Sequence, residues 1–243
     1  MWQNINLEKC FAFLNCQLAS ERKRGPPPKP SITISRMCGS GGRTVASKLA
    51  EYLQEYTPAA CHWTVFDRKL IERVLEDHHL SKRIAEFLPE NHKSAFSDTL
   101  EGLLDLHPPI STIVKQTAET VRNLAEIGYV ILVGRGANII TRRLPNVFHV
   151  RLVGSLERRM ERVQEVYELG RQDAREFMHK QETGRNRYLK EHFGKNIDDP
   201  LLYHLIINTD QISYEDTARL IANAVIKRFQ LEPCGKNPLA QSH

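Results

Sequence analysis

The sequence contains no apolar stretch long enough to cross a membrane. A membrane-spanning helix needs about 20 consecutive, mainly apolar residues, and polar or charged residues interrupt every apolar run of this chain well before that length. The N-terminal segment also lacks the basic start that precedes the apolar part of a secretory signal peptide. We therefore expect a cytoplasmic protein that does not bind membranes.

Cysteine is scarce, and the cysteines that are present follow no motif. The chain has five of them, and none forms a C-x-x-C pair. An odd and scattered set argues against a disulfide framework and against a zinc cluster. A reducing compartment agrees with this composition.

The excess of positive charge is small. Lys and Arg number 34 against 29 Asp and Glu, which gives a net charge of +5. This balance favours anionic partners. A nucleic-acid-binding surface, however, is usually more basic and carries aromatic side chains among its basic ones, whereas the arginines here alternate with glutamates. We expect a small nucleotide as the partner and no nucleic acid, and the sequence leaves the oligomeric state open.

The composition suits one α/β domain of ordinary size, because 41% of the 243 residues are hydrophobic and 26% are charged. Residues 1–30 are predicted to form a short helix and a linker, since the prolines of KRGPPPKP exclude helix and central strand. The core domain is predicted to span residues 31–230. Residues 231–243 show no periodicity and are predicted to be a flexible tail.

Short apolar strands alternate with amphipathic helices through the core domain. Strands separated by helices indicate a parallel sheet that is covered on both faces. Residues 74–109 interrupt this alternation and are predicted to be a mainly helical insertion. The predicted strands are 32–35, 62–66, 129–133, 147–153 and 202–208, and the predicted helices are 44–56, 69–77, 112–127, 156–168 and 214–229.

The segment SITISRMCGSGGRT at residues 31–44 is typical of a strand, a glycine-rich turn and the start of a helix. This arrangement directs backbone N–H groups and the helix dipole toward a phosphate. The strict pattern G-x-x-x-x-G-K-[ST] is not met, because Arg36 stands in place of the first glycine and Gly42 in place of the lysine. Arg43 is the candidate substitute for that lysine. Taken alone, the loop is equally well explained as a phosphate site or as a tight turn.

Three further stretches accompany this loop: VFDRKLIERV at 65–74, VILVGRGANII at 130–140 and RNRYLKEHFGKNIDDPLLYHLIINTD at 185–210. Together with ISRMCGSGGRTVA they resemble the cytidylate kinase-like family, a divergent branch of the P-loop nucleoside monophosphate kinases. The resemblance covers about residues 31–230. It implies an α/β P-loop kinase fold: a three-layer sandwich with a five-stranded parallel sheet, a helical insertion that binds the nucleoside monophosphate, and a lid bearing arginines.

The resemblance also implies roles for individual residues. The ATP phosphates would lie on Gly39, Ser40, Gly41, Gly42, Arg43 and Thr44, with Thr44 as the magnesium ligand. The acceptor would contact Asp67, Arg73 and Arg135, and the catalytic cations would be Arg43, Arg159, Arg162 and Arg185. Gly136 replaces an aspartate that serves the cytidine side in cytidylate kinases, which puts specificity for CMP in doubt.

Residues 156–168 form the predicted arginine-rich helix. Its buried face is predicted to consist of Leu156, Met160, Val163 and Tyr167, with the arginines outside that face. A solvated helix face with Glu–Arg pairs is the alternative interpretation of these arginines, and we favour it for Arg158. Further along, Asn208, Thr209 and Asp210 are predicted either to line the nucleotide base site or to cap the next helix.

Two functional hypotheses follow. The first is an ATP-dependent phosphotransferase that uses Mg²⁺ and acts on a CMP- or dCMP-like nucleoside monophosphate or a related small phosphate ester. The second is a catalytically weakened nucleotide-binding regulatory or sensor protein. The second rests on the missing lysine, on the missing aspartate at position 136, and on the lack of a clear acidic residue after the third predicted strand.

Overall fold

The computed structural model describes residues 29–57, 62–76 and 112–232, together with the helical residues 8, 11–13, 15 and 16 near the N-terminus. Most of the predicted linker, insertion and tail lies outside these residues, as does most of the predicted helix in residues 1–30. None of the helices in the described ranges is long and apolar enough to cross a membrane.

The centre of the protein is a five-stranded sheet with the strand order β2-β3-β1-β4-β5. Every pair of neighbouring strands is parallel. This confirms the predicted α/β fold with a parallel sheet. The strands are β1 Ser31–Arg36, β2 Thr64–Phe66, β3 Val130–Val133, β4 Val147–Val153 and β5 Leu205–Asn208.

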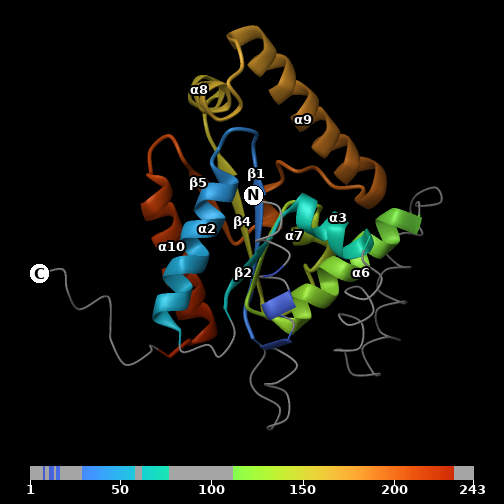
Figure 1. Ribbon diagram of the computed structural model, residues 1–243, viewed down its shortest axis with the longest axis vertical. Helices are drawn as coiled ribbons and strands as arrows, with labels where there is room; N and C mark the ends of the chain where they lie inside the picture. The colour runs from blue at the N-terminus through green and yellow to red at the C-terminus, as the bar shows by residue number, and fades with distance from the viewer. Residues whose placement is uncertain are drawn as a thin grey trace, which may run out of the picture.

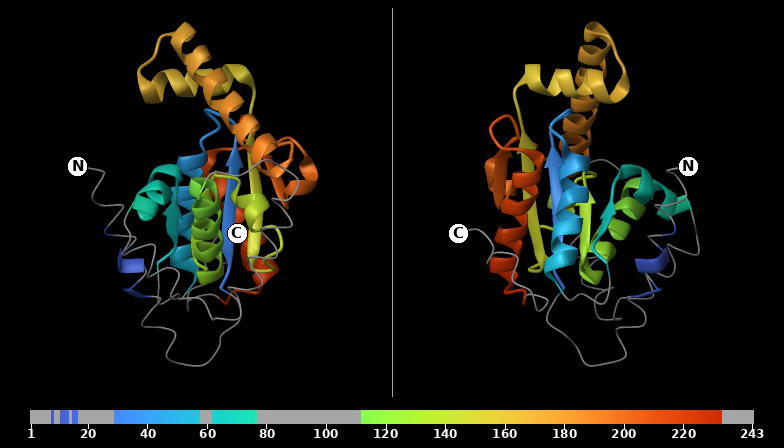
Figure 2. Two further views of the ribbon diagram at one scale, coloured as in Figure 1. Left: turned by 90° about the vertical axis from the view of Figure 1, so that its right-hand side faces the viewer. Right: turned by 60° about the vertical axis from the view of Figure 1, so that its left-hand side comes forward.

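Helices cover both faces of this sheet, as Figures 1 and 2 show. One layer consists of α2 (Gly42–Tyr56) and α10 (Tyr214–Phe229). The opposite layer consists of α3 (Arg68–Glu76), α6 (Thr112–Ile127) and the short α7 (Ala137–Ile140). Two more helices, α8 (Leu156–Tyr167) and α9 (Arg171–Phe193), project beyond the sheet at the top of Figure 1 and form the lid.

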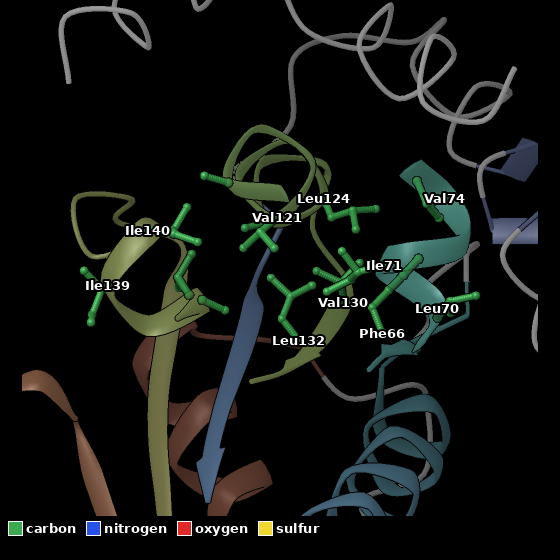
Figure 3. Close-up of a cluster of buried hydrophobic side chains, with 14 of the residues drawn as sticks. Phe66, Leu70, Ile71, Val74, Val121, Leu124, Val130, Leu132, Ile139 and Ile140 are labelled. Atoms are coloured by element: carbon green, nitrogen blue, oxygen red, sulfur yellow. The ribbon is translucent and has the colours of Figure 1, made fainter. Parts of the chain in front are cut away.

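The alternation of side chains along β3 connects the two helical layers. Val130 and Leu132 point into the hydrophobic cluster formed with α3, α6 and α7, and Figure 3 shows them between α6 and Phe66 of β2. Ile131 and Val133 belong to the cluster on the other face, with α2 and α10. Because both faces are buried, the strand is apolar at every position, as expected for a central parallel strand.

The predicted strand 202–208 is wrong at its beginning. Residues Pro200–Leu202 form a short 3-10 helix instead, and β5 begins at Leu205. The side chain of Asp199 accepts a hydrogen bond from the Leu201 N–H at 2.9 Å, and Pro200 occupies the first turn. This is the combination of residues that favours a turn over an extended strand.

The predicted buried face of α8 is also partly wrong. Met160 and Val163 are buried, but Leu156 is 43% exposed and Tyr167 is 49% exposed. Arg159, expected outside that face, is only 8% exposed. The reason is that α8 packs on α9 and on the glycine loop rather than on the sheet, in a small cluster that contains Cys38, Met160, Val163, Ala174 and Met178.

A stacked pair of histidines joins β4 to the residue before β5. The rings of His149 and His204 lie 5.0 Å apart, and the backbone N–H of His149 donates to Nδ1 of His204 at 2.8 Å. His149 also shares a 2.8 Å hydrogen bond with the hydroxyl of Thr33. Burial, together with nearby His204 and Arg228, lowers the pKa of His149 to about 3.

This pair predicts that the protein loses stability in mild acid. A histidine whose pKa is lower in the folded state than in the unfolded state stabilises the fold fully above about pH 6.5, and this stability is lost as the pH falls toward the folded value. For His149 the loss at pH 5 is about 2 kcal/mol, since one pKa unit corresponds to about 1.4 kcal/mol. Urea unfolding at pH 7, 6 and 5 measures it.

The variant His149→Gln should reduce the slope of the unfolding free energy against pH by the amount that corresponds to about one proton bound on unfolding. The variant His62→Gln, at an exposed position, should leave this slope unchanged. An equal slope in wild type and His149→Gln contradicts the assignment.

Candidate active site

The loop between β1 and α2 is held between two helices. Gly39 and Gly41 have positive φ angles of 83° and 77°, the left-handed region that glycine adopts readily. A Cβ atom on Gly39 would collide with the backbone of Arg159 in α8, and one on Gly41 would collide with the ring of Tyr214 in α10. Ser40 is buried and its hydroxyl donates to the carbonyl of Met37 at 3.0 Å, which closes the turn.

The loop presents backbone donors at the N-terminus of α2. Gly41 caps this helix without any side-chain hydrogen bond to its first turn. At the start of the loop, the N–H of Cys38 donates at 3.1 Å to the carboxylate of Glu182 in α9. An N–H group that holds a carboxylate has the geometry to hold a phosphate oxygen.

Arg159 joins the lid to this loop. Its guanidinium donates to the carbonyls of Gly154 at 2.9 Å and Cys38 at 3.0 Å, and it pairs with Glu182 at 2.5 Å. Cys38 belongs to the loop, Glu182 to the lid helix α9, and Gly154 to the connection between β4 and α8. Arg159 is therefore fixed at the loop, with a protein carboxylate as its counter-ion.

Arg162 and Arg185 reach the loop from different sides. Arg162 donates to the hydroxyl of Thr44 at 3.1 Å, and its guanidinium lies 4.8 Å from the ring centroid of Tyr214. Arg185 donates to the carbonyl of Arg36 at 3.1 Å. The structure thus brings three of the four predicted catalytic arginines to the two ends of the loop.

The fourth, Arg43, has a different environment. Its side chain is 59% exposed and forms a 2.8 Å ion pair with Asp67. The other oxygen of Asp67 accepts the N–H of Leu70 at 3.1 Å, at the start of α3. A residue predicted to bind ATP phosphate and a residue predicted to bind the acceptor therefore bind each other.

A cavity of about 370 Å³ lies at the ends of β1 and β3, beneath α9. No carboxylate belongs to its lining among the residues that the structure describes. Its cationic side chains come from four segments of the chain, three of them from α9: Arg36, Arg68, Arg135, Lys180, Arg185 and Arg187. Such an excess of positive charge suits an anionic ligand.

Two polar groups of this cavity lack partners within the described part of the chain. Nδ2 of Asn138 and Nε of Arg135 are buried without a hydrogen bond. Arg135 has a left-handed backbone with φ 56°, an uncommon conformation for a residue with a side chain. It pairs with Glu72, and burial, with nearby Arg68, lowers its pKa. The side chain of Arg73, the remaining predicted acceptor contact, lies outside the described residues.

Gly136 has a structural reason to be glycine. Its φ is 67°, it is the N-cap of α7, and a Cβ atom there would lie 3.1 Å from the ring of Phe193. An aspartate at this position would be strained and crowded by α9.

A second cavity of about 340 Å³ lies on the other side of the loop. Its lining includes Gly39, Arg162 and Tyr214 and the residues Thr209 and Asp210 that follow β5. Asp210 accepts the N–H of Ser155 at 2.6 Å, which lowers the pKa of its carboxyl. Ser213 caps α10, because its hydroxyl accepts the N–H of Asp216 at 3.0 Å. Asp210 is therefore not the cap of that helix, and it is part of this cavity.

Comparison with known proteins matches this arrangement to one family. Residues 31–211 match the model of the cytidylate kinase-like family. The chain belongs to this family. No curated protein matches the sequence significantly.

One of the solved structures that this chain resembles supports the fold. An uncharacterized protein from Eubacterium ventriosum has 22% sequence identity to this chain, with 82% of this chain and 99% of that one covered and a TM-score of 0.62. Shikimate kinase from Acinetobacter baumannii, solved with shikimate, has 20% identity over 83% of this chain and 95% of its own, at a TM-score of 0.45. APS kinase CysC from Mycobacterium tuberculosis, solved with AMPPNP and APS, has 15% identity over 83% of this chain and 99% of its own, at a TM-score of 0.41. Likeness at this level says nothing about the ligands of the present chain.

Several residues of the two cavities were not singled out by sequence reasoning. On α9, Lys180, Gly184 and Arg187 line the larger cavity at the spacing i, i+4, i+7, which places them on one helix face. That spacing is a signal available in the sequence. Tyr214 and Glu182 gave no such signal, because their roles depend on the packing of α10 and α9 against the loop.

The close packing of the loop predicts that Gly39→Ala is destabilising. A left-handed residue with a side chain loses about 1–2 kcal/mol, and the collision with the backbone of Arg159 adds to this loss. Gly184→Ala is the matched control in α9, where a Cβ atom meets nothing within 4 Å. It should stabilise the fold by about 0.5–1 kcal/mol. Equal unfolding free energies for the two variants in urea contradict this account of the loop.

Proposed function

We propose that this cytidylate kinase-like protein transfers the γ-phosphoryl group of ATP to a small phosphorylated acceptor, either a CMP- or dCMP-like nucleoside monophosphate or a related phosphate ester. The observation that carries the proposal is the placement of two cavities on the two sides of one glycine loop. In the proposal ATP occupies the 340 Å³ cavity and the acceptor occupies the 370 Å³ cavity.

The distribution of charge supports this assignment. Phosphoryl transfer depends on positioning and on stabilising the charge that spreads over the transferred oxygens. Arg162 on the ATP side and Arg185 on the acceptor side both contact the loop region through hydrogen bonds. The acceptor needs no general base, because a phosphate ester is largely ionised at neutral pH.

The backbone of residues 39–44 would hold the ATP phosphates, at the N-terminus of α2. Thr209, Asp210 and Tyr214 would surround the nucleoside part of ATP. On the other side, Arg135 and Arg185 would hold the acceptor phosphate, with Arg73 as a further predicted contact.

A magnesium ion at Thr44 would be held mainly by phosphate and water, and the Thr44 hydroxyl would first have to give up its hydrogen bond from Arg162. No group of three or more His, Cys, Asp or Glu side chains that could hold a metal occurs among the described residues. Magnesium bound with a nucleotide needs only one or two protein ligands and keeps several waters. We propose that Thr44 supplies one ligand and that magnesium, when bound, neutralises charge on the phosphate oxygens.

The lining of the acceptor cavity also bears on the identity of the acceptor. Its unpartnered Nδ2 of Asn138 and its cationic side chains are hydrogen-bond donors, and no carboxylate is among the described residues that line it. We therefore propose that the part of the acceptor beyond its phosphate presents hydrogen-bond acceptors.

One observation favours the alternative of a nucleotide-binding regulatory or sensor protein. Glu182 occupies the N–H of Cys38 and pairs with Arg159, so a side chain of the lid already holds groups that a phosphate would use. A protein whose lid blocks its own phosphate site would bind ATP and respond to it without transferring phosphate.

A phosphorus NMR time course with Mg²⁺, ATP and a panel of ribo- and deoxynucleoside monophosphates and sugar phosphates distinguishes the two functions. The enzyme should form one specific diphosphate product, faster than ADP forms in an acceptor-free control. Arg185→Ala should lower kcat/KM for that acceptor about 100-fold through the lost charge-assisted hydrogen bonds. Arg219→Ala should not, because this exposed arginine on α10 is not among the residues that line either cavity.

An unchanged spectrum together with calorimetric binding of ATP would contradict the enzyme and support the sensor. Absence of both turnover and ATP binding would contradict both functions.

A further inference from the structure

The side chain of Arg36 crosses the glycine loop. Arg36 is the last residue of β1. A Cβ atom on Gly42 would lie only 2.9 Å from Cγ of Arg36, and a Cβ atom on Gly134 would collide with its Nη1. The side chain therefore extends from the end of β1, over the first residue of α2, to the residue that follows β3.

A side chain at position 42, where an ordinary phosphate-binding loop has its lysine, would begin in contact with this path. In the pattern G-x-x-x-x-G-K-[ST], Gly42 stands at the lysine and Arg36 stands at the first glycine. A side chain at position 42 would strike Arg36, and a glycine at position 36 would leave the space empty. The two departures from the pattern thus compensate each other, because the cation has moved to the start of the loop and the glycine to its end.

The guanidinium of Arg36 has no partner in the part of the chain that the structure describes, whether by hydrogen bond or by ion pair. Burial, with Arg185 and Arg43 nearby, lowers its pKa to about 10, so it keeps its charge at neutral pH. Asp67 attracts it from a distance but is paired with Arg43. A charge that is partly removed from water without a partner is unfavourable, and an anionic ligand would relieve this.

Arg43, the other cation of the loop, offers no comparable geometry. It is 59% exposed and its counter-ion is Asp67. It does not belong to the described lining of either large cavity, whereas Arg36 lines the 370 Å³ one.

We propose that Arg36, and not Arg43, replaces the missing lysine: its guanidinium binds the outer phosphates of ATP and, from its place in the wall of the acceptor cavity, also contacts the group being transferred. Two parallel N–H donors let an arginine hold two phosphate oxygens at once, which a lysine does not do. This inference rests on the proposal that the loop binds ATP.

Calorimetric titration with Mg²⁺·ATP and with adenosine tests the inference. Arg36→Gln should weaken ATP binding about 10- to 100-fold, because a charge-assisted contact to phosphate is lost. Binding of adenosine, which has no phosphate, should change less than about twofold. Arg36→Lys should keep part of the ATP affinity. The matched control Arg43→Gln, in the same loop, should weaken ATP binding less than about threefold.

Thermal unfolding without ligand provides a second readout. Removing an unpaired, partly buried cation that lies near two other arginines should raise the Tm of Arg36→Gln above that of wild type. A purely structural role for Arg36 would lower it.

The outcomes separate this inference from the function on which it rests. Wild type that binds no ATP overturns both. Wild type that binds ATP while Arg36→Gln binds it equally well, or while Arg43→Gln loses more affinity, overturns the role of Arg36 and leaves the proposed function standing. If Arg36→Gln does not fold, the ATP affinity of Arg36→Lys decides. An affinity that is reduced no more than that of Arg43→Gln then overturns the role of Arg36.

Discussion

Helices α8 and α10 approach the loop between β1 and α2 so closely that only glycine fits at Gly39 and Gly41. Everything else at the site follows from this close packing. It brings Arg159 and Arg162 from α8 onto the loop, places the ring of Tyr214 beside it, and leaves the N-terminus of α2 without a side-chain cap.

The second constraint is electrostatic. Several cationic side chains lie where β1 and β3 end, and the nearby carboxylates pair with only some of them. Asp67 pairs with Arg43 and Glu182 pairs with Arg159. Arg36 has no partner among the described residues. A phosphate on the N–H of Cys38 would compete with Glu182 for that donor. If phosphate binds there as we propose, its binding would be coupled to the contact between lid and loop, and α9 would have a physical reason to move.

The sequence predicts the sheet and its layers well, because buried parallel strands are short apolar runs and the covering helices have one apolar face. It does not predict α9 as a helix, because only four of its 23 residues are buried, namely Ala174, Met178, Leu189 and Phe193. The motif at residues 39–44 also indicates a tight turn at the N-terminus of α2, where we propose that phosphate binds. Which arginine points inward is not a local property, since the path of Arg36 depends on Gly134, a residue of a different strand-to-helix connection. For the same reason the burial of Arg159 was missed: its partners Glu182 and Cys38 come from segments that meet only in three dimensions.

A crystal structure with Mg²⁺ and a non-hydrolysable ATP analogue tests the central claim most directly, because it shows which groups replace one another at the loop. The account predicts the triphosphate on the backbone of residues 39–44, the guanidinium of Arg36 on its outer phosphates, and the carboxylate of Glu182 displaced from Cys38. A nucleotide bound elsewhere, or a triphosphate contacted by Arg43 while Arg36 stays without a phosphate contact, would contradict it.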